Sequence, residues 1–394
     1  MKLEIPDYVN ELMNELNYSG YECYVVGGAV RSLLLDLPVH DYDLTTNALP
    51  EQMQKVFVHY KTIETGIKHG TLTVLSHHHP IEITTYRKDA AYQDHRHPDA
   101  VTFTSAIQED CARRDFTIIA FCYNETDGLL DFFHGKEDLD AKILRCIGDP
   151  EKRFEEDALR ILRAIRFAAR LHFTMEEKTE QALFKKKELL SYVSIERIHD
   201  EMDGLLQADA CGGYLDTYKE IFALFLPEIN AVTAWNDVIA KIDAAPADSV
   251  IRMAVLLTYC SDPAGVLKRM KYSNESTREI LDCIKYQKEP LLDTIALRKF
   301  ISVYPSAVQD YFQYRKAVDP SFDASALYKE YEQILKRHDC ITLSQLELKG
   351  NDVIALGYQG KEIAEVLQKL LTAVMEEKVP NKKAELTAYI KSED

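Results

Sequence analysis

Residues 24–34 read Tyr-Val-Val-Gly-Gly-Ala-Val-Arg-Ser-Leu-Leu, and residues 41–44 read Asp-Tyr-Asp-Leu. The apolar run is typical of a buried strand, the two glycines indicate a turn, and a helix-forming segment follows. On a strand, the spacing of Asp41 and Asp43 places both carboxylates on one face. Mg²⁺ takes one or two carboxylates and completes its shell with water and phosphate oxygens, and glycines let backbone N–H groups approach phosphates closely. The stretch therefore predicts a nucleotidyl-transfer site.

A third acidic side chain, Glu82, lies in a β-branched run at residues 80–86. Alone, a glycine pair is usually only a turn, and an Asp-x-Asp sequence is usually a solvated strand end. The glycine turn, the Asp-containing strand and the later acidic strand together resemble the polymerase-beta superfamily of nucleotidyltransferases. The sequence Val-Gly-Gly-Ala-Val-Arg resembles, more narrowly, the class II tRNA nucleotidyltransferases, which build the 3′ CCA end of tRNA, and the related bacterial poly(A) polymerases.

This resemblance implies transfer of a nucleoside monophosphate from CTP or ATP to the 3′-hydroxyl of tRNA, with release of pyrophosphate. Mg²⁺ is the implied cofactor, and its ligands would be Asp41 and Asp43. The implied catalytic residues are Asp41, Asp43 and Glu82. The triphosphate is expected to contact Gly27, Gly28 and Arg31.

A second motif, Arg113-Arg114-Asp115, precedes an apolar run that ends at Cys122. Alone, it would be interpreted as a helix cap with flanking charges. In the family that the chain resembles, this motif recognises the ribose, so Arg114 and Asp115 are expected to bind the 2′-hydroxyl and the triphosphate. The chain departs from the family pattern at three positions, where the family usually has Asp, Gly and Asn: Ser32, Asp36 and Ile119.

A third motif reads Glu-Asp-Ala-Leu-Arg at residues 156–160, in a stretch that we expect to be helical. Asp157 and Arg160 would be neighbours on one helix face, where a surface ion pair contributes at most ~0.5 kcal/mol. A carboxylate only accepts hydrogen bonds, whereas a guanidinium only donates them. Such a pair would match the amino donor and ring-nitrogen acceptor of cytosine and adenine, and would exclude uracil and guanine. The motif matches the family's Glu-Asp-x-x-Arg, which implies nucleotide contacts from Glu156, Asp157, Arg160 and Arg163.

The net charge of −17 argues against unspecific nucleic-acid binding, so positive charge for RNA must be concentrated locally. Residues 158–175 contain no acidic residue, and four arginines at helical spacing would form one stripe there. The alternative is an ordinary solvated helix face, or arginines that cap neighbouring helices. Two glycines near the C-terminal end either meet RNA phosphates through backbone N–H groups or are only turn residues. The expected RNA-binding residues are Arg166, Arg170, Gly357 and Gly360.

The length of 394 residues suggests two to four domains. Strands and helices alternate at first, and from Asp149 onward the pattern is helical almost without interruption. We predict an α+β fold in which a polymerase-beta-like mixed sheet with helices is followed by an all-α neck, body and tail. The predicted boundaries are 1–145 for the nucleotidyltransferase head, 146–205 for the neck with the base-selecting motif, 206–270 for the body and 271–394 for the tRNA-binding tail.

Residues 87–98 have many charges and little periodicity, which predicts a mobile surface loop. Their pattern of Asp89, Tyr92, Arg96 and Pro98 resembles the flexible loop of the family. Family members that add only the two cytidines tend to have a shortened loop. Its length here favours an enzyme that also adds the adenosine.

The eight cysteines include no Cys-x-x-Cys pair, and no apolar run approaches the roughly 18–20 residues that a membrane span needs. The N-terminus shows no signal-peptide pattern. We expect a cytoplasmic monomer or homodimer that binds tRNA, CTP and ATP and has no membrane partner. The alternatives within the enzyme class are a nucleotidyltransferase that adds only A and a poly(A) polymerase. Outside it, the alternative is an RNA-binding protein with a degenerate nucleotidyltransferase head.

Overall fold

The computed structural model describes residues 2–89, 101–288, 293–304 and 308–393. The chain divides into two compact units, the first made of Met1–Ala231 with Arg269–Lys271 and the second of Val232–Lys268 with Tyr272–Asp394. Among the described residues, every helix is too short or too polar to cross a membrane. The sheet and all three sequence motifs belong to the first unit.

A seven-stranded mixed sheet with the order β3-β4-β5-β2-β1-β8-β9 forms the N-terminal part of the first unit. Its strands are β1 (Cys23–Val26), β2 (Asp43–Thr46), β3 (Lys61–Ile63), β4 (Thr71–Ser76), β5 (His79–Thr85), β8 (Cys122–Asn124) and β9 (Gly128–Leu130). Strand β2 runs parallel to β5, whereas the other neighbouring pairs are antiparallel. The predicted mixed sheet with helices is therefore confirmed.

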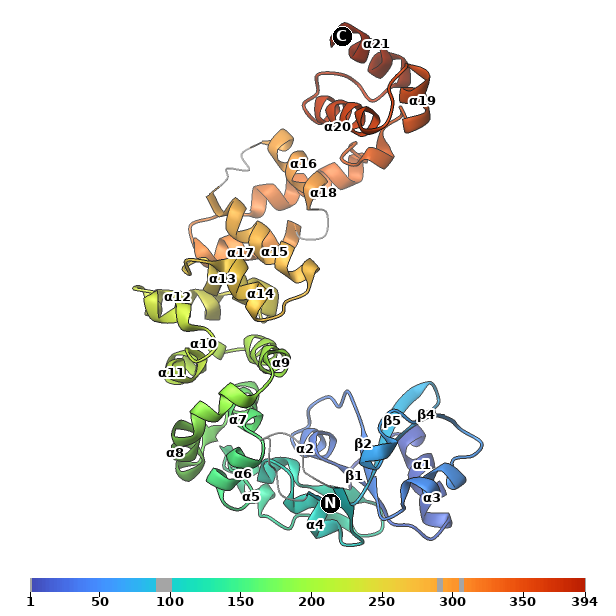
Figure 1. Ribbon diagram of the computed structural model, residues 1–394, viewed down its shortest axis with the longest axis vertical. Coiled ribbons are helices and arrows are strands. Elements are labelled where there is room, and N and C mark those ends of the chain that lie inside the picture. Colours follow the sequence, from blue (N-terminus) through green and yellow to red (C-terminus); the bar gives the residue numbers. More distant parts are fainter. Residues whose placement is uncertain (1, 90–100, 289–292, 305–307, 394) are drawn as a thin grey trace. The chain divides into compact units, whose positions relative to one another are not determined.

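Short helices accompany the sheet (Figure 1): α1 (Asp7–Tyr18), α2 (Gly28–Leu34), α3 (Pro50–Val56), α4 (Ile107–Ala112) and α5 (Gly135–Asp140). Helix α1 buries Val9, Leu12, Met13 and Leu16, whose spacing gives one apolar face. This face lets α1 pack against α3 and β4. Helix α2 begins directly after β1, at the glycine turn, so the turn lies at the end of β1 that pairs with Asp43 at the start of β2.

The remainder of the first unit is mainly helical and comprises α6 (Pro150–Glu156), α7 (Leu159–Leu171), α8 (Glu177–Lys186), α9 (Ile195–Leu206), α10 (Cys211–Thr217) and α11 (Lys219–Phe222). Helix α7 packs most extensively against α9. The predicted helical continuity needs a small correction, because β11 (Thr174–Met175) follows α7 and pairs with β10 (Ile143–Leu144). This pairing gives the backbone after α7 hydrogen-bond partners in a parallel ladder.

The described part of the second unit contains helices and no strand: α12 (Trp235–Ala244), α13 (Ser249–Leu257), α14 (Pro263–Arg269), whose last residue belongs to the first unit, α15 (Asn274–Lys285), α16 (Thr294–Val303), α17 (Val308–Val318), α18 (Ser325–Arg337), α19 (Gly350–Ala355), α20 (Lys361–Met375) and α21 (Lys383–Glu393). The all-α continuation of the fold is thus confirmed. The boundaries between the four predicted domains stay a prediction.

Two local predictions are corrected by the structure. Strand β2 begins only at Asp43, so Asp41 precedes it, although the alternation of exposed Asp41 and Asp43 with buried Tyr42 continues through both positions. Residues 87–89, predicted as part of a loop, form β6 (Arg87–Asp89), which pairs with β7 (Val101–Phe103) because the ladder satisfies their backbone groups. The predicted loop residues Tyr92, Arg96 and Pro98 lie outside the described residues.

Candidate active site

Strand register brings two predicted acidic residues together. Asp43, at the start of β2, is the direct partner of Glu82 in β5, and on its other side it is the partner of Val26 in β1. The side chains of Asp41, Asp43 and Glu82 are all exposed. Partial desolvation of the Asp43 carboxyl group, together with the negative charges of Glu82 and Asp41, raises its pKa, and the Arg114 guanidinium opposes this shift. Carboxylates that repel one another in this way are suited to share a cation.

Among the described residues, no group of three or more His, Cys, Asp or Glu side chains forms a metal site by itself. A cation bound at Asp43 would therefore need further oxygen ligands from water and from a phosphorylated substrate. This donor set fits Mg²⁺, which is usually held by one or two carboxylates plus substrate phosphates. The residues positioned to contribute are Asp41, Asp43 and Glu82.

The glycine turn lies one residue beyond the β1 position that faces Asp43. Gly27 has a φ of +70°, and a Cβ at this position would lie 3.1 Å from Nη1 of Arg114. A Cβ on Gly28 would lie 3.7 Å from Nη2 of Arg31. The positive φ favours glycine at position 27, and a Cβ there would also displace the Arg114 guanidinium by a few tenths of an ångström. The Arg31 guanidinium lies at ordinary contact distance from Gly28.

Both of these arginines have unused donor capacity. In the described part of the chain, the buried Nε atoms of Arg31 and Arg114 have no hydrogen-bond partner. Burial, followed by the positive charges of Arg170 and Arg166, lowers the pKa of Arg31 to about 10. A bound polyanion would attract both guanidinium groups and offset the repulsion between Arg31 and its neighbouring arginines. The turn is therefore suited to a triphosphate.

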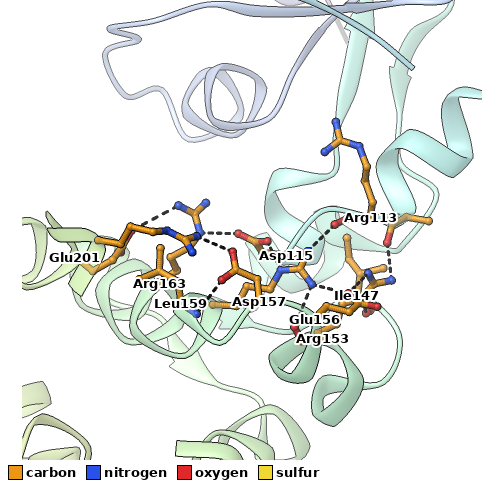
Figure 2. A network of polar contacts seen from close by, with 12 residues as sticks. Arg113, Asp115, Ile147, Arg153, Glu156, Asp157, Leu159, Arg163 and Glu201 are labelled. Atoms are coloured by element: carbon orange, nitrogen blue, oxygen red, sulfur yellow. Dashed lines mark hydrogen bonds and ion pairs between the residues drawn. The ribbon is translucent and has the colours of Figure 1, made fainter. Parts of the chain in front are cut away.

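Asp115 follows α4, and its carboxylate bonds to two arginines of α7 in the network that Figure 2 shows. Its Oδ1 accepts from Nε of Arg160 at 2.7 Å, and its Oδ2 accepts from Nε of Arg163 at 2.6 Å. Burial alone would raise the pKa of Asp115, but the two guanidinium groups outweigh it, and the pKa of Asp115 is lowered. The sequence predicted that Asp115 and Arg114 share one ribose site. In the structure, Asp115 contacts arginines of α7, whereas Arg114 contacts Asp110 and lies beside Gly27.

The predicted helical pairing of Asp157 with Arg160 is wrong in its geometry. Helix α6 ends at Glu156, and Asp157 is extended, with φ −140° and ψ 104°. Its Oδ1 accepts from the backbone N–H of Leu159 at 3.1 Å, and its Oδ2 accepts from Nη2 of Arg197 at 2.8 Å. The short aspartate side chain binds the backbone two residues ahead, which competes with continuation of the helix.

Arg160 is a buried structural residue in this arrangement. Besides Asp115, it donates to Glu156 Oε2 at 2.7 Å and to the backbone carbonyls of Arg153 and Arg113 at 3.1 and 3.0 Å. Its side chain is only 6% exposed, so these charged and neutral acceptors offset the cost of its burial. The Asp157 carboxylate is therefore held by Arg197, whereas the Arg160 guanidinium is held by Asp115 and Glu156.

The four predicted arginines do lie on α7, but they do not form a free basic stripe. Arg163 and Arg166 contact Glu201 of α9, with N···O distances of 3.6 and 2.5 Å, and only Arg170 is exposed. The arginines of α7 therefore join this helix to α9 and to Asp115.

Two predicted glycines lie in the second unit. Gly360 caps the N-terminus of α20 with a φ of +56°, and Gly357 has a φ of +106°. Both glycines therefore have a turn role.

Several residues of the site were not predicted from the sequence. Asp110 is fully buried and accepts from Arg113 Nε at 2.9 Å and from Arg114 Nη2 at 3.4 Å. Arg197 and Glu201 on α9 hold Asp157 and the α7 arginines. The available signal was the spacing of Arg197 and Glu201, four residues apart on an amphipathic helix, which places both on one face.

One departure from the family pattern has a conformational explanation. Asp36 has a φ of +54°, a backbone conformation that favours glycine.

The raised pKa of Asp43 predicts a pH-dependent affinity for divalent cations. A proton competes with the cation for this carboxylate, so affinity should rise as pH increases through the raised pKa and then level off. Replacing Glu82 with glutamine removes a like charge, which lowers the pKa of Asp43 and moves the acid limb to lower pH. Calorimetric titration with Mg²⁺ or Mn²⁺ across pH measures this limb. The exposed Glu51→Gln change on α3 is the control, and an unmoved limb in Glu82→Gln contradicts the coupling.

Comparison with known proteins gives consistent matches along the chain. The poly A polymerase head domain matches residues 23–145, the probable RNA- and SrmB-binding site of polymerase A matches residues 172–232, and tRNA nucleotidyltransferase domain 2 matches residues 248–390. The CCA-adding enzyme of Lactobacillus johnsonii is 34% identical over 395 residues, which cover 96% of this chain and 95% of that protein. The CCA-adding enzyme of Streptococcus mutans is 31% identical over 397 residues, covering 97% and 96%.

A solved structure shows the same fold. The crystal structure of the Bacillus stearothermophilus CCA-adding enzyme in complex with CTP superposes with a TM-score of 0.80 at 27% sequence identity. The superposition covers 99% of this chain and 98% of that chain.

Proposed function

Because this chain belongs to the CCA-adding enzymes and is a nucleotidyltransferase, we propose that it adds C, C and A to the 3′ end of tRNA without a nucleic-acid template, using CTP and ATP. Pyrophosphate is the second product of each addition. The observation that carries the proposal is the strand register, in which Val26, followed at once by the glycine turn, faces Asp43, and Asp43 faces Glu82. A triphosphate at the turn therefore lies beside the acidic residues.

The side chains around the turn have distinct roles in this proposal. Gly27 and Gly28 let the backbone approach the triphosphate, while Arg31 and Arg114 donate to its oxygens. Mg²⁺ bound by Asp41 and Asp43 would lower the pKa of the attacking 3′-hydroxyl and stabilise the leaving pyrophosphate. Glu82 adds negative charge beside Asp43 and serves as the third catalytic acid.

Base choice is assigned to the segment between α6 and α7. Asp157 is fixed by Leu159 N–H and Arg197, yet each carboxylate oxygen has two lone pairs, so it can still accept from the amino group of cytosine or adenine. Uracil and guanine present a carbonyl oxygen at that place and would repel it. Glu156, Arg160 and Arg163 hold the segment against Asp115 and complete the nucleotide pocket.

RNA contacts complete the proposal. The basic side chains assigned to the phosphates of the acceptor end are Arg166 and Arg170 on α7. The backbone N–H groups near Gly357 and Gly360 are assigned to the tRNA in the second unit. The two arginine contacts should contribute to a salt-dependent affinity for tRNA.

The test is nucleotide addition by the purified full-length protein with Mg²⁺ and labelled CTP or ATP. Three tRNA substrates, which lack CCA, CA or only A, separate the possible activities. We expect CTP to be used twice on the first, once on the second and not on the third, with ATP used once after the second C. Long A tails would indicate a poly(A) polymerase, and ATP use on the third substrate alone would indicate an enzyme that adds only A. No incorporation on any of the three would leave only an RNA-binding role.

Replacing Asp157 with alanine should weaken base discrimination. The change removes the acceptor that matches the amino group, and one such contact contributes roughly 1–3 kcal/mol of discrimination. The preference for CTP over UTP, measured as the ratio of kcat/KM values, should therefore fall by about 5-fold to 150-fold. Glu155→Ala, which removes an exposed carboxylate of α6 that pairs with Lys186, is the matched control. An unchanged ratio in Asp157→Ala would refute this role.

A further inference from the structure

Three guanidinium groups surround the ring of Phe167 on α7. The central guanidinium carbons of Arg166, Arg163 and Arg31 lie 4.6, 5.4 and 5.5 Å from the ring centroid. Phe116, which directly follows Asp115, meets the same ring edge to face, with centroids 5.8 Å apart. Arg31 comes from α2 beside the glycine turn, whereas Arg163 and Arg166 come from α7. The ring therefore lies where the phosphate-binding turn meets the helical part of the unit.

The charges around this ring are unevenly balanced. Arg163 contacts Asp115 and Glu201, and Arg166 contacts Glu201. Arg31 instead donates to the neutral hydroxyl of Ser32 at 3.4 Å, and its buried Nε has no partner in the described part of the chain. Burial and the charges of Arg170 and Arg166 lower the pKa of Arg31 to about 10, which shows that this guanidinium is held against desolvation and repulsion.

The face of an aromatic ring carries partial negative charge and attracts cations, more strongly where water is excluded. The Phe167 ring is half-buried, and it lies within cation–π distance of Arg31 as well as of the two paired arginines. Asp115 and Glu201 form ion pairs with Arg163 and Arg166. For Arg31, the cation–π attraction of the Phe167 ring takes the place of such an ion pair. An aliphatic side chain of similar size would fill the space but would not attract the cation.

We propose that Phe167 is a positioning residue for the nucleotide triphosphate, because its ring holds Arg31 beside Gly27 and Gly28 while the site is empty. The proposal rests on the proposed function only in that the turn binds a triphosphate. Once the triphosphate is bound, its negative charge takes over the stabilisation of Arg31. Loss of the ring should therefore weaken triphosphate binding and raise KM for CTP and ATP alike, with a smaller change in kcat and no change in base preference.

Phe167→Leu and Phe167→Tyr separate the ring's attraction for cations from packing. We expect Phe167→Leu to weaken the binding of inorganic tripolyphosphate with Mg²⁺, and to raise KM for both nucleotides, by about 5-fold to 30-fold. Phe167→Tyr keeps the aromatic face and should stay within about twofold of the unchanged protein. Phe167→Met also fills the space without an aromatic ring. It replaces Phe167→Leu if thermal unfolding shows that the leucine variant is strongly destabilised.

Combining Phe167→Leu with Arg31→Ala tests whether the ring acts through Arg31. If the ring acts through Arg31, Phe167→Leu should have little further effect on tripolyphosphate affinity in the Arg31→Ala background. Equal losses in Phe167→Leu and Phe167→Tyr, or additive losses in the double variant, would overturn the proposal. Calorimetric binding of tripolyphosphate needs no nucleotide transfer. A protein that binds tripolyphosphate as expected but adds no nucleotide would therefore contradict the proposed function and leave the role of Phe167 standing.

Discussion

Asp43→Ala should abolish nucleotide addition while leaving tRNA binding nearly unchanged. Asp43 joins the two halves of the proposed catalytic site, since it pairs with Val26, just before the glycine turn, and with Glu82 on the neighbouring strand. A metal-assisted site contributes several kcal/mol of transition-state stabilisation, and each 1.4 kcal/mol changes a rate tenfold. We therefore expect the rate constant for nucleotide addition to fall by roughly 10³-fold to 10⁵-fold, measured in single-turnover incorporation of labelled CTP.

The controls for Asp43→Ala separate chemistry from folding and binding. Asp43 is exposed at the strand start, so the thermal unfolding midpoint should change little. The affinity for tRNA, measured by filter binding, should also be kept, because the RNA contacts are assigned to other elements. Glu51→Gln, an exposed change on α3 of the same unit, should leave turnover intact. Retained turnover in Asp43→Ala would remove the catalytic assignment.

Arg160→Ala is expected to reduce stability more than any other single change considered for α7. The change leaves Asp115 with Arg163 as its remaining ion-pair partner in this cluster and removes a donor from two backbone carbonyls. Breaking a buried ion pair by deleting one partner costs about 3–5 kcal/mol. Chemical denaturation at neutral pH should show a loss of this size. Arg170→Ala, at an exposed position of the same helix, should change the free energy of unfolding by less than about 0.5 kcal/mol.

The pH dependence of stability gives a second measure of the same cluster. The lowered pKa of Asp115 means that its ion pairs stabilise the fold above the ordinary aspartate pKa, and that this stability is lost as pH falls through the lowered value. In Arg160→Ala, one of the two guanidinium groups that lower the pKa of Asp115 is absent, so its folded-state pKa should lie closer to the ordinary aspartate value. The acid-linked loss of stability should therefore be smaller and should be complete at a higher pH than in the unchanged protein. A variant of near-normal stability that loses only its discrimination against UTP would instead support direct base reading by Arg160.

Local patterns in the sequence predicted well the strands, turn and helix that carry the proposed catalytic residues. The buried strand, the glycine turn, the helix with Arg31 and the acidic strand at residues 80–86 all appear, because each depends on short-range rules of alternation and turn formation. The motif proposed to select the base shows where such rules fail. The three-residue spacing of Asp157 and Arg160 implies a shared helix face only if the helix is continuous, and the bond from Asp157 to Leu159 N–H accompanies a break.

The sequence by itself determined the order of the motifs, the mixed sheet followed by helices and the chemical types present at the site, since these depend on residues close together in the chain. Only the tertiary structure decided which charges meet. The pairing of Asp43 with Glu82 joins parallel strands, and the contacts of Asp115 with Arg160 and of Asp157 with Arg197 join separate elements. A buried charge needs a partner, but its sequence neighbourhood does not specify which distant residue packing will bring to it.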